Sequence, residues 1–157
     1  MHFIGCGKTN YLRYLGYQFK DKKLIYLPPE LVDYISKPEF LPFMLNHKNS
    51  ILIIEDAENI IKSRDSGETT TQAVANLLNL SDGLLGDSLH QPIIATFNCE
   101  LNSIDPALLR KGRLITQYEF GKLSTENAQK LSENLGFRTK ITEPMTLADI
   151  YNQIKEN

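Results

Sequence analysis

The sequence ILIIEDAE, residues 51–58, sets the architecture that we expect for this chain. Four apolar residues in a row, preceded by Asn49 and Ser50 and followed by acids, are typical of a strand buried on both faces of a parallel sheet. In open α/β sheets, ligands bind beyond the carboxyl ends of the strands. Glu55 and Asp56 stand at that end and are therefore candidate ligand-binding residues. Acids that merely stabilise the positive end of a following helix are the competing interpretation.

Short apolar runs alternate with amphipathic segments along the rest of the chain. We expect further strands at residues 24–27, 93–97 and 114–120, and helices at 30–35, 40–45, 73–80, 125–135 and 145–154. Ser124 is a suitable N-cap for the fourth of these helices, and Gly136 is suited to end it. The alternation predicts an α/β fold with a parallel sheet.

A glycine-rich turn, GCGKT at residues 5–9, precedes a helical segment at 10–15. The backbone N–H groups of such a turn can converge on phosphate oxygens. Lys8 would add a positive charge beside the β- and γ-phosphates, and the Thr9 hydroxyl would bind Mg²⁺. His2 stands where the full phosphate-loop pattern has a glycine, and only residues 1–4 precede the loop, where a buried strand is expected. A glycine turn that caps a helix is the alternative.

Two further polar groups follow the strand predicted at 93–97. Asn98 would lie beside the two acids and could hydrogen-bond a water molecule or the γ-phosphate, although asparagine also ends many strands before turns. The sequence IDPALLRKGRL, residues 104–114, places Arg110 and Arg113 three positions apart. A guanidinium group that reaches a neighbouring subunit can stabilise charge on a transferring phosphoryl group. Taken alone, these arginines fit a basic surface turn that caps a helix better than a catalytic role.

The composition is that of an ordinary globular protein, with 41% hydrophobic residues, 23% charged residues and a net charge of −2. This charge gives no indication of nucleic-acid binding. Cys6 and Cys99 have no partners at metal-ligand spacing, so we expect two reduced thiols. No apolar run approaches the roughly 20 residues that span a bilayer. We therefore expect a cytoplasmic protein without a membrane segment.

Taken in order, these elements resemble the AAA-clade ATPase module of the AAA+ superfamily. GCGKT resembles its Walker A motif, IIEDAE its Walker B motif, IIATFN its sensor-1 strand and IDPALLRKGRL its second region of homology. The usual order of the Walker B acids is Asp then Glu, whereas here Glu55 precedes Asp56. The resemblance implies a P-loop NTPase fold, a three-layer α/β/α arrangement around a parallel sheet with a short C-terminal helical lid. It divides the chain into a nucleotide-binding core, 1–122, and a lid, 123–157.

The same resemblance implies that ATP and Mg²⁺ bind between the subunits of a homo-oligomeric ring, often a hexamer, which remodels a protein partner. Aligned with the two acids of the Walker B motif, Glu55 takes the position that binds the metal and Asp56 the position that binds the attacking water. The reverse assignment stays open. The implied nucleotide-binding residues are Gly5, Cys6, Gly7, Lys8, Thr9 and Asn10, with Thr9 and Glu55 on the metal. The implied catalytic residues are Glu55, Asp56, Asn98, Arg110 and Arg113.

Two departures from the family pattern define an alternative function. The first glycine of the phosphate loop is replaced by His2, and the buried strand expected directly before the loop is missing. An AAA-like assembly or scaffold module that binds ATP weakly, or does not hydrolyse it, would tolerate both changes. A small-molecule P-loop kinase is disfavoured by residues 104–114, which have no counterpart in its chemistry.

Overall fold

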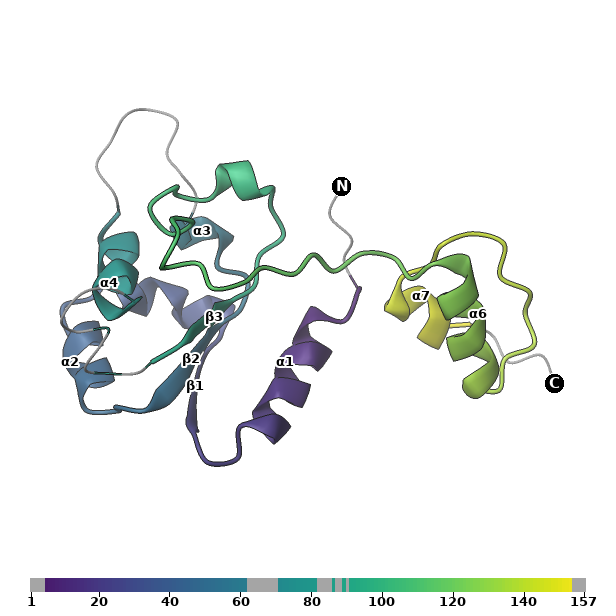
Figure 1. Ribbon diagram of the computed structural model, residues 1–157, viewed down its shortest axis with the longest axis horizontal. Helices are drawn as coiled ribbons and strands as arrows, with labels where there is room; N and C mark the ends of the chain where they lie inside the picture. The colour runs from purple at the N-terminus through teal and green to yellow at the C-terminus, as the bar shows by residue number, and fades with distance from the viewer. Residues whose placement is uncertain (1–4, 62–70, 82–85, 87–88, 90, 154–157) are drawn as a thin grey trace. The chain divides into compact units, whose positions relative to one another are not determined.

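The computed structural model describes residues 5–61, 71–81, 86, 89 and 91–153. The chain divides into two compact units (Figure 1). The larger unit is Leu15–Gln117, and the smaller unit combines Met1–Tyr14 with Tyr118–Asn157. The expected division into a core of residues 1–122 and a lid of 123–157 stays a prediction. His2, the departure in the phosphate loop, lies outside the described residues.

Three parallel strands form the sheet of the larger unit, in the order β1-β2-β3 (Figure 1). They are β1 (Lys23–Leu27), β2 (Ser50–Ile54) and β3 (Ile93–Ala95). Ile54 pairs with Leu27 on one side and with Ala95 on the other, so the three strands end at the same edge of the sheet. Every residue of β2 is buried, as its unbroken apolar run predicts. The expected α/β fold with a parallel sheet is confirmed.

The hydrophobic core of the larger unit lies between the sheet and a layer of short helices. The helices are η1 (Pro29–Ser36, a 3₁₀ helix), α2 (Phe40–Leu45), α3 (Glu58–Ile61) and α4 (Gln72–Ser81). Each contributes buried apolar side chains that pack with Leu52 and Ile54 of β2. Pro29 begins η1 and Lys37, just before Pro38, ends it, which keeps this helix short.

Two buried side-chain amides, of Gln91 and Asn76, link parts of this layer by hydrogen bonds. The Nε2 atom of Gln91 donates to Met44 O at 3.0 Å, to His47 O at 2.6 Å and to Ser50 Oγ at 3.1 Å. Asn76 of α4 donates from Nδ2 to Ile35 O at 2.6 Å. Because a buried carbonyl without a donor is costly, Gln91 stabilises the turn between α2 and β2, and Asn76 holds α4 against η1.

The strand predicted at residues 114–120 is wrong. In the structure Leu114 forms only an isolated bridge with Lys111, and Ile115 is 90% exposed. A strand requires a neighbour for its backbone hydrogen bonds, and no described strand lies next to this segment to supply them. The strand expected at 93–97 ends at Ala95, because Thr96 and the residues after it turn towards the end of β2.

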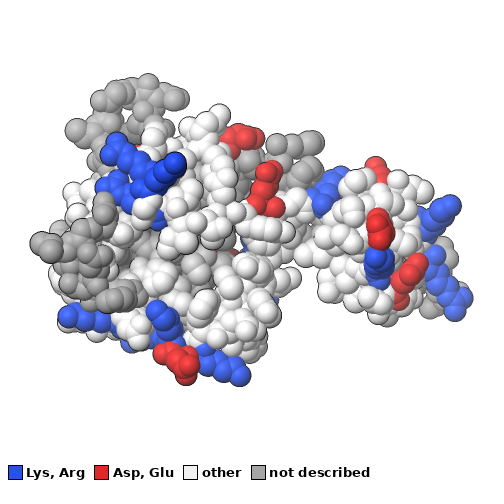
Figure 2. All heavy atoms as spheres, in the orientation of Figure 1, with Lys and Arg blue, Asp and Glu red and all other residues white. Residues whose placement is uncertain are grey.

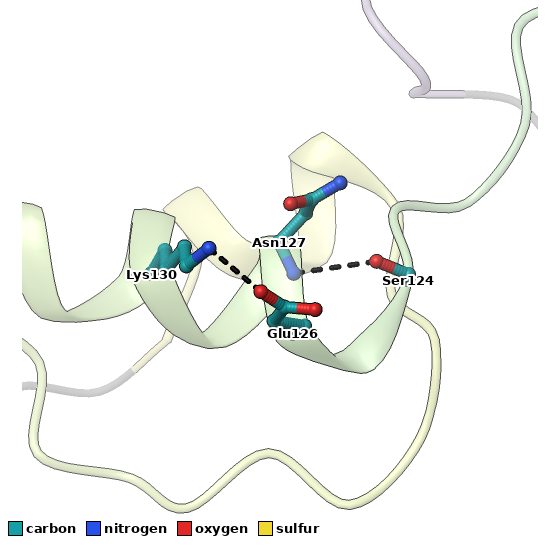
Figure 3. A network of polar contacts seen from close by, with 4 residues as sticks. All are labelled: Ser124, Glu126, Asn127 and Lys130. Carbon is teal, nitrogen blue, oxygen red and sulfur yellow. Dashed lines mark hydrogen bonds and ion pairs between the residues drawn. The ribbon is translucent and has the colours of Figure 1, made fainter.

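The C-terminal part of the smaller unit contains two helices, α6 (Thr125–Asn134) and α7 (Leu147–Tyr151). Ser124 caps α6 as predicted, since its Oγ accepts from Asn127 N at 3.3 Å, and Lys130 pairs with Glu126 at 2.7 Å (Figure 3). Helix α7 is shorter than the predicted 145–154, because Thr146 is its N-cap. Leu123 and Met145 exchange backbone hydrogen bonds and bring the starts of the two helices together.

Charged side chains are mixed on the visible surface. Figure 2 shows basic side chains in separate small groups, with acidic side chains among them, on the face that it draws. Of the helices in the described part of the chain, none has both the length and the apolar character needed to cross a bilayer.

We expect Gln91→Leu to lower the free energy of unfolding by about 2 kcal/mol, because the change removes the donor from buried acceptors while nearly preserving volume. Urea unfolding followed by circular dichroism measures this change. Gln18→Leu, which replaces an exposed glutamine of the same unit, is the matched control and should leave stability nearly unchanged. Equal midpoints for Gln91→Leu and the native protein would contradict the role assigned to Gln91.

The cap of α7 predicts a pH dependence in acid. Asp149 accepts from Thr146 Oγ1 at 2.7 Å and from Thr146 N at 3.2 Å, and these bonds hold the pKa of Asp149 below its ordinary 3.8. A lowered pKa contributes stability above the unfolded-state value, and that stability is lost as pH falls through the folded-state value. Thermal melts at neutral pH and at about pH 3 should therefore show a smaller acid-induced loss for Thr146→Ala than for the native chain. Thr142→Ala, on an exposed residue, should behave like the native chain.

Candidate functional site

The carboxyl edge of the sheet gathers polar side chains from all three strands. Tyr26 comes from the end of β1, Glu55 and Asp56 follow β2, and Thr96 and Asn98 follow β3. Parallel pairing in register places the ends of the strands side by side, and so brings together residues separated by as many as 72 positions, from Tyr26 to Asn98. This is the edge at which ligands bind in α/β sheets.

Glu55 is attached to β1 by both its backbone and its side chain. Its N–H donates to Leu27 O at 3.3 Å, and its Oε2 accepts from the Tyr26 hydroxyl at 2.5 Å. The hydrogen bond to Glu55 is the main cause that raises the pKa of Tyr26 from 10.0 to about 12, with smaller effects from burial and from nearby carboxylates. The phenol is therefore a hydrogen-bond donor throughout the physiological range.

Asp56 is attached to the residues that follow β3, on the other side of β2. Its N–H donates to Thr96 Oγ1 at 3.3 Å, and its Oδ1 accepts from Asn98 Nδ2 at 3.0 Å. Its φ of 50° lies in the left-handed region, where aspartate is one of the few tolerated residues. The chain turns there, so that the N–H of Ala57 reaches Thr96 O at 2.9 Å. The structure therefore places Asn98 beside Asp56.

The side-chain oxygen atoms at this edge of the sheet are suited to bind a hard divalent cation. Carboxylate and amide oxygens are ligands of Mg²⁺, which binds through one or two carboxylates and takes its remaining ligands from water and phosphate. Within the described residues there is no cluster of three histidine, cysteine or acidic side chains, which a metal held by protein ligands alone would need. Glu55 and Asp56 supply the one or two carboxylates that Mg²⁺ takes from a protein.

The glycine-rich loop belongs to the smaller unit. Gly5 and Gly7 have φ values of 81° and 94°, and α1 (Lys8–Gln18) begins directly after them. A Cβ at Gly5 would lie 2.6 Å from the Cβ of Ala148, and one at Gly7 would lie 2.5 Å from Leu147 Cδ1. Ala148 N also donates to Gly5 O at 3.0 Å. Both positions therefore require glycine, for backbone conformation and for close approach to α7.

The other residues of the loop differ in exposure. Cys6 is buried, and burial raises the pKa of its thiol above 9.0, while the charge of Lys8 partly offsets this effect. Thr9 and Asn10 are exposed in the first turn of α1. The start of α1 thus carries a lysine and an exposed hydroxyl directly after the glycine turn, groups that are suited to phosphate.

The two arginines of residues 104–114 lie in the larger unit in different settings. Arg113 donates from Nη1 to Ala107 O at 2.9 Å, across a turn that Asp105 stabilises by accepting from Ala107 N at 2.8 Å. Gly112, with φ 92°, allows the chain to return to this turn. Arg110 is exposed. Arg113 thus helps to hold the turn from which Arg110 projects.

The structure brings Glu55, Asp56 and Asn98 together, and places the residues of the phosphate loop in the other unit. Sequence reasoning missed Tyr26 and Thr96, which contact the two acids. The signal for Thr96 was its place at the end of an apolar run. Tyr26 could be found only from the knowledge that β1 neighbours β2.

Comparison with known proteins agrees with these features. A family model described as ATPase family associated with various cellular activities (AAA) matches residues 3–122. The chain is 35% identical over 126 residues to ATPase family gene 2 protein of Saccharomyces cerevisiae, covering 74% of this chain and 16% of that protein. It is 32% identical over 105 residues to the Cell division cycle protein 48 homolog of Archaeoglobus fulgidus, covering 64% and 14%.

A third relative is Protein CdcH of Halobacterium salinarum, which is 35% identical over 74 residues, or 46% of this chain and 10% of that protein. The chain therefore spans between 10% and 16% of the length of these relatives. The family model covers most of the chain, including the phosphate loop, both acids, Asn98 and both arginines. The chain belongs to the AAA family of ATPases.

Proposed function

We propose that this AAA-family ATPase module binds ATP with Mg²⁺ and hydrolyses it. The observation that carries the proposal is the pair of acids at the carboxyl edge of the sheet, with Asn98 donating to Asp56 at 3.0 Å. Family membership supports nucleotide binding, and the glycine loop with Lys8 and Thr9 supplies groups suited to phosphate.

Each residue has a task in this mechanism. Lys8 and the N–H groups of the loop bind the phosphates, and Thr9 and Glu55 hold the metal. Mg²⁺, when bound, offsets negative charge on the phosphate oxygens. Asp56 orients the attacking water and accepts its proton, and Asn98 keeps the Asp56 carboxylate in place. Asp56 is suited to this task because its backbone and its side chain are both held by hydrogen bonds.

We also propose that the module works within a homo-oligomeric ring, often hexameric in this family, and remodels a macromolecular partner. Arg110 and Arg113 would then approach the nucleotide of the neighbouring subunit. The exposure of Arg110 and the anchored turn behind it support this assignment. A cytoplasmic location is part of the proposal, because a chain with only two cysteines is typical of compartments in which thiols stay reduced.

Steady-state ATP hydrolysis across a series of protein concentrations tests the proposal. Sites completed by neighbouring subunits give a specific activity that rises with concentration, because assembly follows mass action. Background activity at every concentration, with no nucleotide binding by calorimetry, would instead favour the assembly or scaffold function that His2 in the loop allows.

Asp56→Asn should leave ATP binding intact and lower turnover by a factor of about 10² or more, the size expected for a lost general base. Nucleotide titration and turnover are measured on the same preparation. Asp33→Asn, on an exposed acid of η1, is the matched control and should retain native turnover. Native turnover in Asp56→Asn would remove Asp56 from this role.

Mixing inactive variants tests whether the arginine acts between subunits. Lys8→Ala subunits keep Arg110, and Arg110→Ala subunits keep the phosphate loop, so equimolar random mixing should make about a quarter of the interfaces complete. Turnover should rise above that of either variant alone. Lys111→Ala, on the exposed neighbouring cation, should remain active without mixing. If no mixing ratio restores turnover, Arg110 does not act in trans.

A further inference from the structure

Tyr26, which lies outside the four sequence motifs, contacts one of the two acids. Its ring stands on β1 and is 53% exposed, so burial in the core does not explain its presence at this position. Its hydroxyl donates to Glu55 Oε2 at 2.5 Å. The contact spans 29 positions of sequence and depends on the parallel pairing of β1 with β2.

The two consecutive acids are held from opposite sides of β2. Glu55 is bound to β1, through Leu27 O to its backbone and through Tyr26 to its carboxylate. Asp56 is bound to the residues after β3, through Thr96 to its backbone and through Asn98 to its carboxylate. Because different residues hold the two carboxylates, each can keep its own position. Two acids that perform different functions need such separate positions.

Tyrosine is well suited to support a glutamate at this place. A glutamate side chain has three rotatable bonds and gains entropy when its carboxylate is free to move. A tyrosine ring has only two side-chain torsions, so a backbone held in the sheet places the hydroxyl within a small volume. The hydrogen bond therefore restricts the Glu55 carboxylate before any ligand arrives.

We infer that Tyr26 is a positioning residue that holds Glu55 for the Mg²⁺ ion of a bound nucleotide and leaves Asp56, with Asn98, to the attacking water. The inference rests on the proposed function and extends it. It selects between the two assignments of Glu55 and Asp56 that the sequence left open. Removal of a hydrogen-bond partner of a metal-binding side chain commonly lowers metal affinity by roughly 10- to 100-fold.

The test compares nucleotide binding with and without the metal. Calorimetry gives the affinity of the purified protein for ATPγS in excess EDTA and in excess Mg²⁺, and the ratio of the two is the magnesium enhancement. Tyr26→Phe keeps the ring and removes the hydroxyl. We expect it to lower the enhancement about tenfold and to leave the affinity in EDTA unchanged. Tyr17→Phe makes the same chemical change at a 73% exposed residue and should keep the native enhancement.

Variants of the acids show through which carboxylate Tyr26 acts. Glu55→Gln should abolish the enhancement, and adding Tyr26→Phe to it should then have no further effect. Asp56→Asn should keep the enhancement, and Tyr26→Phe should lower it in that background as in the native one. A Tyr26→Phe effect that persists in Glu55→Gln would overturn the inference, because Tyr26 would then act elsewhere.

The remaining outcomes separate this inference from the proposed function. A native protein that binds ATPγS more tightly with Mg²⁺, together with a Tyr26→Phe variant of equal enhancement, overturns the role of Tyr26 alone. An equal loss of affinity in EDTA and in Mg²⁺ also overturns it, since a general structural defect would produce that pattern. A native protein that binds no nucleotide under either condition overturns both the proposed function and the inference.

Discussion

The parallel pairing of β2 with a strand on each side is the constraint on which the rest of the structure depends. Parallel strands in register end at one edge, and here that edge receives two acids, an amide and a phenol from three distant parts of the sequence. The apolar residues of β2 make the pairing stable, because all five positions of the strand are buried. The same apolar residues therefore build the core and position the polar residues that follow them.

Much of this could be predicted from local sequence. The strands at 24–27 and 51–54 and the helix Phe40–Leu45 were recognisable because their apolar runs end at prolines or polar residues. The meeting of Asp56 and Asn98 was predictable too, since each follows a strand and parallel strands share an edge. The segment 114–120 shows the limit of such reasoning. Its residues favour a strand, but a strand forms only beside a partner.

The contacts of Glu55 could not be predicted in the same way. Tyr26 contacts Glu55 only because β1 pairs with β2 at a register that places Tyr26 opposite Ile53, and neither strand order nor register is encoded in a short stretch of sequence. The phosphate loop gives a similar example. That Gly5 and Gly7 lie against Leu147 and Ala148 follows from how the two ends of the chain pack within one unit. The sequence predicted that these glycines bind phosphate or form a turn that caps a helix, whereas the structure also packs them against α7.

The left-handed conformation of Asp56 fits the order of the two acids in this chain. A residue with a side chain at φ 50° bears a conformational cost of about 1–2 kcal/mol, and aspartate and asparagine tolerate it best. In the order Asp then Glu, glutamate would occupy this backbone position and its longer side chain would lack that tolerance. In the order Glu then Asp, the short acid stands where the chain bends, and the long acid stands where it can reach across to β1. The order of the two acids in this chain therefore matches side-chain length to local backbone geometry.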